Sequence, residues 1–326
     1  MPKPTLRPKA DKPRALMQYR RLGKTELNIS VIGFGASPLG DVFGPSDAEE
    51  GIKAVHLALD EGINFFDVSP YYGLTLAEER LGQALMGRRG KAVLATKCGR
   101  YGVNEFDFSA KRIRLSVEES LRRLCTDHVD LLQAHDVEFG NVDQIISETI
   151  PAMRRLQEAG KTRYVGISGY PLKVLMRIAQ QLPVDSILSY CRYNLMIDDM
   201  DTVLTPLIER LGIGLINAAP LHMGMLTERG APDWHPAPPQ VRLAVREALA
   251  FCRKQNLDLS ELGLRFCFGY PRVASTLVGM STTEEVYRNL HAFRSPADPE
   301  LISMVKAILA PVANVVWPSG RSENHD

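Results

Sequence analysis

Short apolar runs alternate with helical patterns along nearly the whole chain, and this alternation restricts the fold more than any other feature. Eight runs are typical of strands, and they occupy residues 29–35, 63–66, 92–97, 129–134, 163–168, 186–189, 213–217 and 275–279. Most of them are continuous apolar stretches, as in parallel strands that are covered on both faces. Between them, Ser109 and Gly212 mark helix ends, and Pro151 predicts a kink in the helix before Gly160.

A repeated strand-helix alternation leaves two architectures, an open doubly wound sheet and a closed barrel. The open sheet would be favoured by a Gly-x-Gly-x-x-Gly turn after the first strand. The glycines of GFGASPLGD, at positions 33, 35 and 40, have a different spacing. We therefore expect an α/β fold of the (β/α)8 TIM barrel type, with an N-terminal β-hairpin over residues 18–29 and extra C-terminal helices.

Composition narrows the classes of partner. The chain has 39 basic and 38 acidic residues among 326, so it lacks the basic excess that nucleic-acid or membrane binding usually requires. Its five cysteines include no Cys-x-x-Cys pair, which fits reduced thiols. No apolar run approaches a membrane span, so we expect a cytoplasmic protein. Residues 1–16 are predicted to be a flexible tail, and residues 17–326 a single barrel domain.

Polar side chains stand where three consecutive predicted strands end. Asp67 ends the second, Lys97 the third and His135 the fourth, and Tyr72 lies in the loop just beyond Asp67. In a parallel barrel the catalytic groups come from the carboxyl ends of the strands, and neighbouring strands are about 4.8 Å apart. We therefore expect these four side chains to converge at one site.

Such a convergence has a chemical use. A free tyrosine has a pKa of about 10, which makes it a poor proton-transfer group at neutral pH. A lysine cation beside it would favour the phenolate, and a carboxylate would keep that lysine charged. Tyr72 is thus predicted to be the acid/base, with His135 orienting a substrate oxygen. Each of the four residues taken alone also fits a cap or a packing role, but four at successive strand ends favour catalysis.

Several segments resemble a known family. FFDVSPYYG, ATKCGR, DLLQAHD, GISG and LVGMST, in this order, resemble the aldo-keto reductase superfamily, whose fold is an eight-stranded α/β barrel. Longer segments, such as INFFDVSPYYG and PLHMGMLTERGAPDWHPA, resemble its L-galactose dehydrogenase branch, from about Tyr19 to Gly320. The resemblance places the superfamily's catalytic tetrad on Asp67, Tyr72, Lys97 and His135.

The same resemblance implies a set of cofactor-binding residues, which are Ala36, Ser168, Gly169, Tyr190, Ala218, Pro220, Leu221, Gly224, Gly279, Ser281 and Asn289. Gly169, Tyr190 and Ala218 depart from the residue types common in the family. Members that use NADP carry Lys or Arg where this chain has Ser281. A neutral serine cannot supply a charge-assisted contact to the 2′-phosphate, so NAD is expected and NADP is less favoured, with Arg288 as the alternative source of charge.

The implied reaction is oxidation of L-galactose, or a related aldose such as L-fucose, at C1 to the aldonolactone. Loop positions suggest substrate contacts at Asp41, Phe43, Tyr71, Tyr101 and Asp136. No metal is expected, and the chain is expected to be a monomer or a weak homodimer. Two alternatives stay open, an NADPH-dependent aldehyde or ketone reductase and a non-catalytic regulatory subunit that binds the cofactor.

Overall fold

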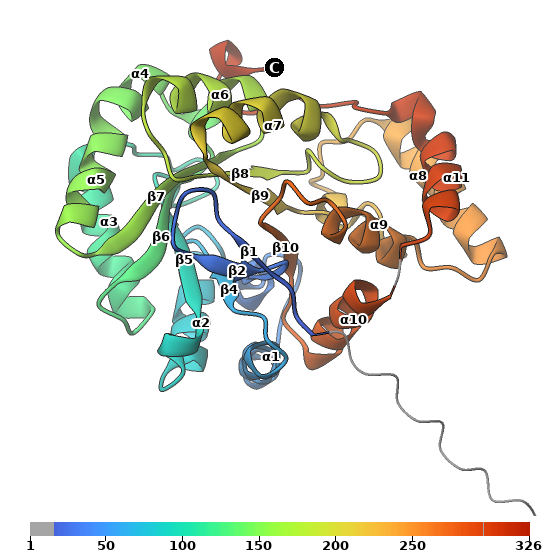
Figure 1. Ribbon diagram of the computed structural model, residues 1–326, viewed down its shortest axis with the longest axis horizontal. Coiled ribbons are helices and arrows are strands. Elements are labelled where there is room, and N and C mark those ends of the chain that lie inside the picture. The colour runs from blue at the N-terminus through green and yellow to red at the C-terminus, as the bar shows by residue number, and fades with distance from the viewer. Residues whose placement is uncertain (1–15, 296) are drawn as a thin grey trace, which may run out of the picture.

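Eight parallel strands close into a barrel in the computed structural model, which describes residues 16–295 and 297–326. The strands follow one another around the barrel in chain order, and the last pairs with the first (Figure 1). They are β3 (Ile32–Gly35), β4 (Phe65–Asp67), β5 (Val93–Cys98), β6 (Val129–Ala134), β7 (Thr162–Gly169), β8 (Ser186–Tyr190), β9 (Gly214–Ala218) and β10 (Ser275–Gly279). The predicted TIM barrel is confirmed. The predicted tail lies outside the described residues except for Leu16.

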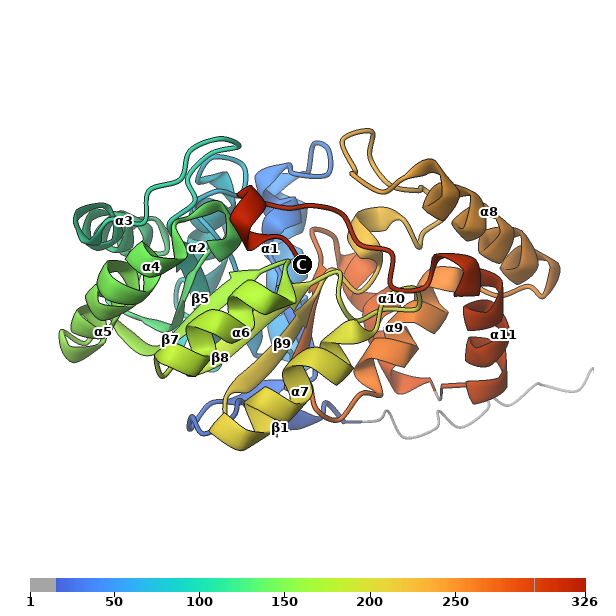
Figure 2. The same ribbon diagram turned by 90° about the horizontal axis from the view of Figure 1, so that it is seen from above.

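Helices surround the barrel and follow its strands. They are α1 (Ala48–Asp60), α2 (Leu76–Leu85), α3 (Ala110–Arg123), α4 (Val142–Gln144), α5 (Ile150–Glu158), α6 (Leu172–Gln181), α7 (Asp199–Leu211), α9 (Leu259–Phe268) and α10 (Thr283–Arg294). Two helices are additional to the repeat, α8 (Pro239–Lys254) and α11 (Pro299–Leu309). These two pack against each other beside the barrel (Figure 2).

The helix ends largely follow the sequence signals. Ser109 caps α3 by accepting the Arg112 N–H, and α7 ends at Gly212, whose φ of 68° is left-handed. The helix that contains Pro151 has a π-helical segment over Ile145–Thr149 on its N-terminal side, and the backbone stays helical from α4 through this segment into α5. The change of helix type is consistent with the proline ring, which removes one backbone donor and crowds the preceding turn.

The predicted hairpin is present, but the predicted first strand, residues 29–35, is two strands. β1 (Tyr19–Arg21) pairs with β2 (Asn28–Ser30), and Val31 separates β2 from β3. A single strand cannot pair with β1 outside the barrel and with β4 and β10 within it, so the chain turns at this point. The apolar hairpin residues Leu22, Leu27 and Ile29 join a buried cluster inside the barrel. They close the end of the barrel at which the parallel strands begin.

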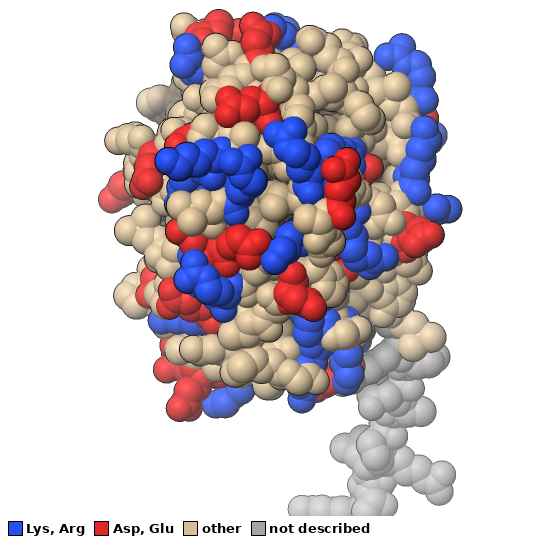
Figure 3. All heavy atoms as spheres, turned by 90° about the vertical axis from the view of Figure 1, so that its left-hand side faces the viewer, with Lys and Arg blue, Asp and Glu red and all other residues tan. Residues whose placement is uncertain are grey.

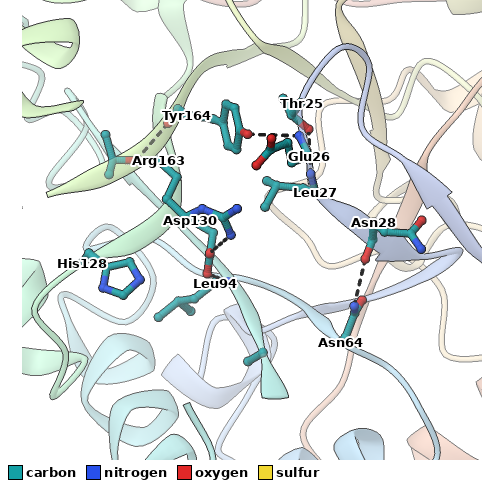
Figure 4. A network of polar contacts seen from close by, with 12 residues as sticks. Thr25, Glu26, Leu27, Asn28, Asn64, Leu94, His128, Asp130, Arg163 and Tyr164 are labelled. Carbon is teal, nitrogen blue, oxygen red and sulfur yellow. Dashed lines mark hydrogen bonds and ion pairs between the residues drawn. The ribbon is translucent and has the colours of Figure 1, made fainter. Parts of the chain in front are cut away.

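Polar contacts fix the hairpin to the strand starts (Figure 4). The Tyr164 hydroxyl of β7 accepts the Glu26 N–H at 3.0 Å. Asp130 of β6 accepts three hydrogen bonds of 2.9 Å, from Arg89, Arg163 and the Leu94 N–H. This end of the barrel is therefore held by apolar packing and by a carboxylate whose partners come from three other segments.

Acidic and basic side chains are mixed on the face over α3 and α5 (Figure 3). No helix in the described part of the chain has the length and apolar character needed to cross a bilayer.

Candidate active site

A cavity of about 1590 Å³ opens at the carboxyl ends of the barrel strands. Typical small-molecule pockets measure about 300–1,000 Å³, so this cavity has room for more than one ligand. Asp67, Tyr72, Lys97 and His135 all line it. The structure thus brings together the four residues that stand at the ends of the predicted strands.

A buried ion pair forms the floor of the site. Lys97 Nζ contacts Asp67 Oδ1 and donates to the Val68 carbonyl at 3.0 Å. Burial alone would lower the pKa of Lys97, but the Asp67 carboxylate and the Tyr72 phenol outweigh it, and the net pKa is raised. Lys97 is therefore a cation at neutral pH, even though both members of the pair are buried.

Gln133 supports the same carboxylate, although the sequence analysis assigned no role to this residue. Its Nε2 donates to Asp67 Oδ2 at 2.8 Å. The available signal was its position, because Gln133 lies two residues before His135 and side chains two apart on a strand share a face. Asp67 is thus held from two sides.

Tyr72 is positioned by a turn that follows β4. Its N–H donates to the Ser69 carbonyl at 3.0 Å, and Lys97 Nζ lies 4.9 Å from the centre of its ring. The sequence predicts that Lys97 lowers the pKa of this phenol. Lys97 acts in that direction, but burial is the larger effect and the net pKa of Tyr72 is raised. The resting tyrosine therefore carries its proton.

His135 follows β6 directly and is oriented by Ser69. Ser69 Oγ accepts the Tyr71 N–H at 3.1 Å and lies 3.0 Å from His135 Nδ1. The Ser69 hydroxyl can accept the Tyr71 N–H and donate to Nδ1 at the same time, and on this arrangement we assign the imidazole proton to Nε2. Burial lowers the pKa of His135 to about 3, against the opposing effect of Asp136. A neutral imidazole is thus expected to present an N–H donor at neutral pH.

The cavity also contains most of the residues that were inferred for cofactor binding. All except Ala36 and Gly169 line it, namely Ser168, Tyr190, Ala218, Pro220, Leu221, Gly224, Gly279, Ser281 and Asn289. Ala36 is buried. Gly169 lies against Glu138, since a Cβ at this position would approach Glu138 Oε2 to 2.6 Å.

The predicted substrate residues divide in a similar way. Asp41, Phe43, Tyr71 and Asp136 line the cavity, whereas Tyr101 does not. The Tyr101 hydroxyl accepts the Gly99 N–H at 3.1 Å, and Arg112 covers the ring at 3.9 Å. Tyr101 therefore packs behind the site.

Two further lining residues were missed, Arg100 and Trp317. Arg100 comes two residues after β5, a loop position that the strand-end argument could have included. Trp317 belongs to the C-terminal segment that returns across this end of the barrel (Figure 2). It stacks on Tyr170 at 4.3 Å between ring centres. A contact between residues so distant in the chain leaves no local sequence signal.

Glu138 is a buried carboxyl group behind the cavity wall. Its Oε1 accepts from Ser319 at 3.1 Å and from the Tyr190 hydroxyl at 3.3 Å, while Oε2 has no partner among the described residues. Burial and the nearby Asp136 raise the pKa of Glu138 to about 8.

The lining fits a dinucleotide. Asn289 is buried at the cavity wall, and its side-chain amide has no hydrogen-bond partner in the part of the chain that the structure describes. Gly224, at a φ of 94°, lets the backbone after β9 turn along the cavity. Ser168, Asn289 and the loop from Pro220 to Gly224 would hold such a ligand.

The corner near Ser281 is acidic. Both the N–H and the Oγ of Ser281 donate to Glu285 Oε2, at 2.7 and 3.3 Å. Arg288 lies at the edge of the cavity and pairs with Asp258 at 3.3 Å. Any group bound beside Ser281 therefore meets a carboxylate.

Comparison with known proteins agrees with this geometry. L-galactose dehydrogenase from Arabidopsis thaliana is 46% identical over 94% of this chain and 99% of its own. D-arabinose 1-dehydrogenase from Saccharomyces cerevisiae is 30% identical over 90% of this chain and 94% of its own. The holo form of an aldo-keto reductase from Bacillus halodurans superposes with a TM-score of 0.76 at 29% identity, covering 92% of this chain and 98% of that one. The aldo/keto reductase family model matches residues 31–310, and the chain belongs to this family of oxidoreductases.

Proposed function

We propose that this protein is an NAD-dependent sugar 1-dehydrogenase that oxidises L-galactose, or a related aldose such as L-fucose, at C1 to the aldonolactone. The observation that carries the proposal is the convergence of Asp67, Tyr72, Lys97 and His135 on one large cavity. The names of the Arabidopsis and yeast relatives support a sugar as the substrate. We further propose that the enzyme acts in the cytoplasm, as one barrel domain over residues 17–326.

Each residue of the site has a defined part in the reaction. His135 Nε2–H donates to the anomeric oxygen and orients it, and the Tyr72 phenolate removes the proton from that oxygen. Lys97 stabilises the phenolate, while Asp67 and Gln133 hold the lysine in place. A nicotinamide cofactor held in this cavity would supply the acceptor for the hydride from C1.

The raised pKa of Tyr72 has a consequence for this direction of the reaction. Oxidation needs the phenolate, but burial favours the phenol. Below the pKa, the ionised fraction grows tenfold with each unit of pH. Sugar oxidation is therefore expected to accelerate with rising pH, and the reverse reduction is favoured by acid.

Selection of NAD is supported by the corner around Ser281. A 2′-phosphate there would lie close to the Glu285 carboxylate, which accepts both hydrogen bonds from Ser281. Like charges repel, whereas the neutral ribose hydroxyl of NAD could accept or donate at the same place. Arg288 is already paired with Asp258.

The test is a set of initial rates of NADH and NADPH formation with L-galactose, L-fucose, D-arabinose and their mirror-image sugars. We expect oxidation of L-galactose or L-fucose, with kcat/KM higher for NAD than for NADP. Reduction of simple aldehydes by NADPH without sugar oxidation would instead identify a reductase. Cofactor binding without turnover of either kind would indicate a regulatory subunit.

A further inference from the structure

Arg100 and Asp136 form an ion pair on the cavity wall beside His135. Arg100 Nη1 donates to Asp136 Oδ2 at 2.5 Å, and the same oxygen lies 3.6 Å from His135 Nε2. Both side chains are largely buried, at 15% and 6% exposure, yet both residues line the cavity. The pair therefore lies next to the atom that would hold the reacting oxygen.

Aromatic rings hold the guanidinium group in place. The Arg100 Cζ lies 3.8 Å from the centre of the Tyr71 ring, and 5.2 and 5.4 Å from the Phe106 and Phe139 rings. Phe106 and Phe139 are themselves stacked at 4.5 Å. Since cation–π contacts of this kind favour one orientation, the donors of Arg100 are fixed before any ligand arrives.

Asp136 has an unusual backbone. Its φ of 51° and ψ of 57° are left-handed, a conformation that non-glycine residues adopt uncommonly. Asp136 donates its N–H to Ser168 Oγ at 3.4 Å. Backbone strain of this kind clusters at functional sites, and here it places a carboxylate beside His135.

Each member of the ion pair keeps one polar atom that can still form a hydrogen bond with a ligand. Among the described residues, neither Arg100 Nη2 nor Asp136 Oδ1 has a hydrogen-bond partner. One is a donor and the other an acceptor, and a hydroxyl group can bind both at once. A simple carbonyl oxygen only accepts, so it could use only the arginine.

We propose that Arg100 and Asp136 together bind the hydroxyl on the carbon next to the reacting carbon, and that this contact sets the preference for sugars. The inference rests on the proposed function. If His135 Nε2 holds the anomeric oxygen, the C2 hydroxyl is the next oxygen along the sugar. His135 Nε2 lies 3.6 Å from Oδ2 of Asp136, so the carboxylate of Asp136 is close enough to reach the oxygen on the adjacent carbon.

The test compares L-galactose with 2-deoxy-L-galactose in the full-length enzyme with saturating NAD. We expect the wild type to show a kcat/KM at least about 100-fold higher for L-galactose, because the deoxy sugar leaves both buried polar groups without a partner. In Asp136→Asn and Arg100→Gln this ratio should fall toward one, mainly through a higher KM for L-galactose. Arg112→Gln is the matched control, since Arg112 covers the Tyr101 ring outside the cavity and should leave the ratio unchanged.

The outcomes separate the two proposals. Equal kcat/KM values for the two sugars in the wild type would overturn the role of the pair and leave the dehydrogenase function intact. A parallel loss of activity on both sugars in the two variants would also overturn it, because an ion pair that only holds its loop would produce that pattern. If the wild type oxidises no sugar at all, the proposed function fails, and the inference fails with it.

Discussion

Two carboxylates at opposite ends of the same segment show how the two ends of the barrel differ. Asp130, near the start of β6, accepts hydrogen bonds from Arg89, Arg163 and the Leu94 N–H. Asp136, just beyond the other end of β6, accepts one, from Arg100, and its backbone is left-handed. At the hairpin end the carboxylate forms its hydrogen bonds with other groups of the protein. The cavity end keeps some of its polar groups available for a ligand.

Backbone conformation differs between the cavity lining and the hairpin. Among the non-glycine residues that line the cavity, Asp41, Leu74, Asp136, Ala219 and Met223 have positive φ values. In the hairpin the residue with a positive φ is Gly23, which adopts it without strain. The comparison indicates that residues at the hairpin end of the barrel mainly stabilise the fold, whereas residues at the cavity end serve ligand binding and the proposed reaction. The predictions below test this separation, from the largest expected effect to the smallest.

Removing one hydroxyl group at each end gives the sharpest contrast. We expect Tyr72→Phe to lower kcat by about 10²–10⁴-fold, since it removes the proton-transfer group, and to abolish the rise of the rate with pH. Tyr164→Phe removes the hydroxyl that accepts the Glu26 N–H, and should leave kcat unchanged while lowering stability by about 1 kcal/mol. Steady-state rates measure kcat for each variant, and urea unfolding measures its stability. A kcat loss in Tyr164→Phe would contradict the separation.

Loss of the carboxylate at the hairpin end is expected to affect stability alone. Asp130→Ala leaves two arginines and the Leu94 N–H without their acceptor. We expect the free energy of unfolding to fall by about 2–3 kcal/mol, with kcat of the folded enzyme unchanged. The urea midpoint and a rate per folded molecule report the two quantities. An Asp130→Ala variant with normal stability and a lowered kcat would contradict this prediction.

The pH dependence of the free energy of unfolding should show that keeping His135 buried and neutral destabilises the protein at low pH. Its pKa falls from 6.5 to about 3 on folding, so between these values the unfolded chain binds more protons. Stability therefore falls as the pH is lowered from 6.5 toward 3. In His135→Gln this fall should be less steep, by up to about 1.4 kcal/mol per pH unit. Parallel curves for the two proteins would show that His135 is not held neutral.

Ser69→Ala should have the smallest effect. Without the hydroxyl, His135 Nδ1 loses its partner and the imidazole proton is no longer directed to Nε2. We expect kcat to fall about tenfold, as one weakened hydrogen bond of about 1.4 kcal/mol would produce, with an unchanged affinity for NAD. Nitrogen NMR of His135 should show one tautomer in the wild type and a mixture in the variant. A wild-type histidine protonated at Nδ1 would refute the assignment.

The sequence was sufficient for the barrel because eight continuous apolar runs have few other arrangements. It also predicted that Asp67, Lys97 and His135 would meet, since neighbouring strands end at one edge. It could not predict the split of residues 29–35, because hairpin and barrel strands are equally apolar. Nor could it predict the net pKa of Tyr72, which depends on the balance of burial against Lys97. Trp317 reaches the cavity only through the path of the folded chain.

The order of the strands also bears on how such a protein can change over evolutionary time. Asp67 and Lys97 belong to β4 and β5 and His135 follows β6, whereas the cavity-lining residues expected to hold the dinucleotide lie at the ends of β7 to β10 or after them. The two sets occupy separate stretches of one gene. Substitutions at distant sites tend to have additive effects, so a lineage can exchange its cofactor through changes around Ser281 while it inherits its chemistry unaltered.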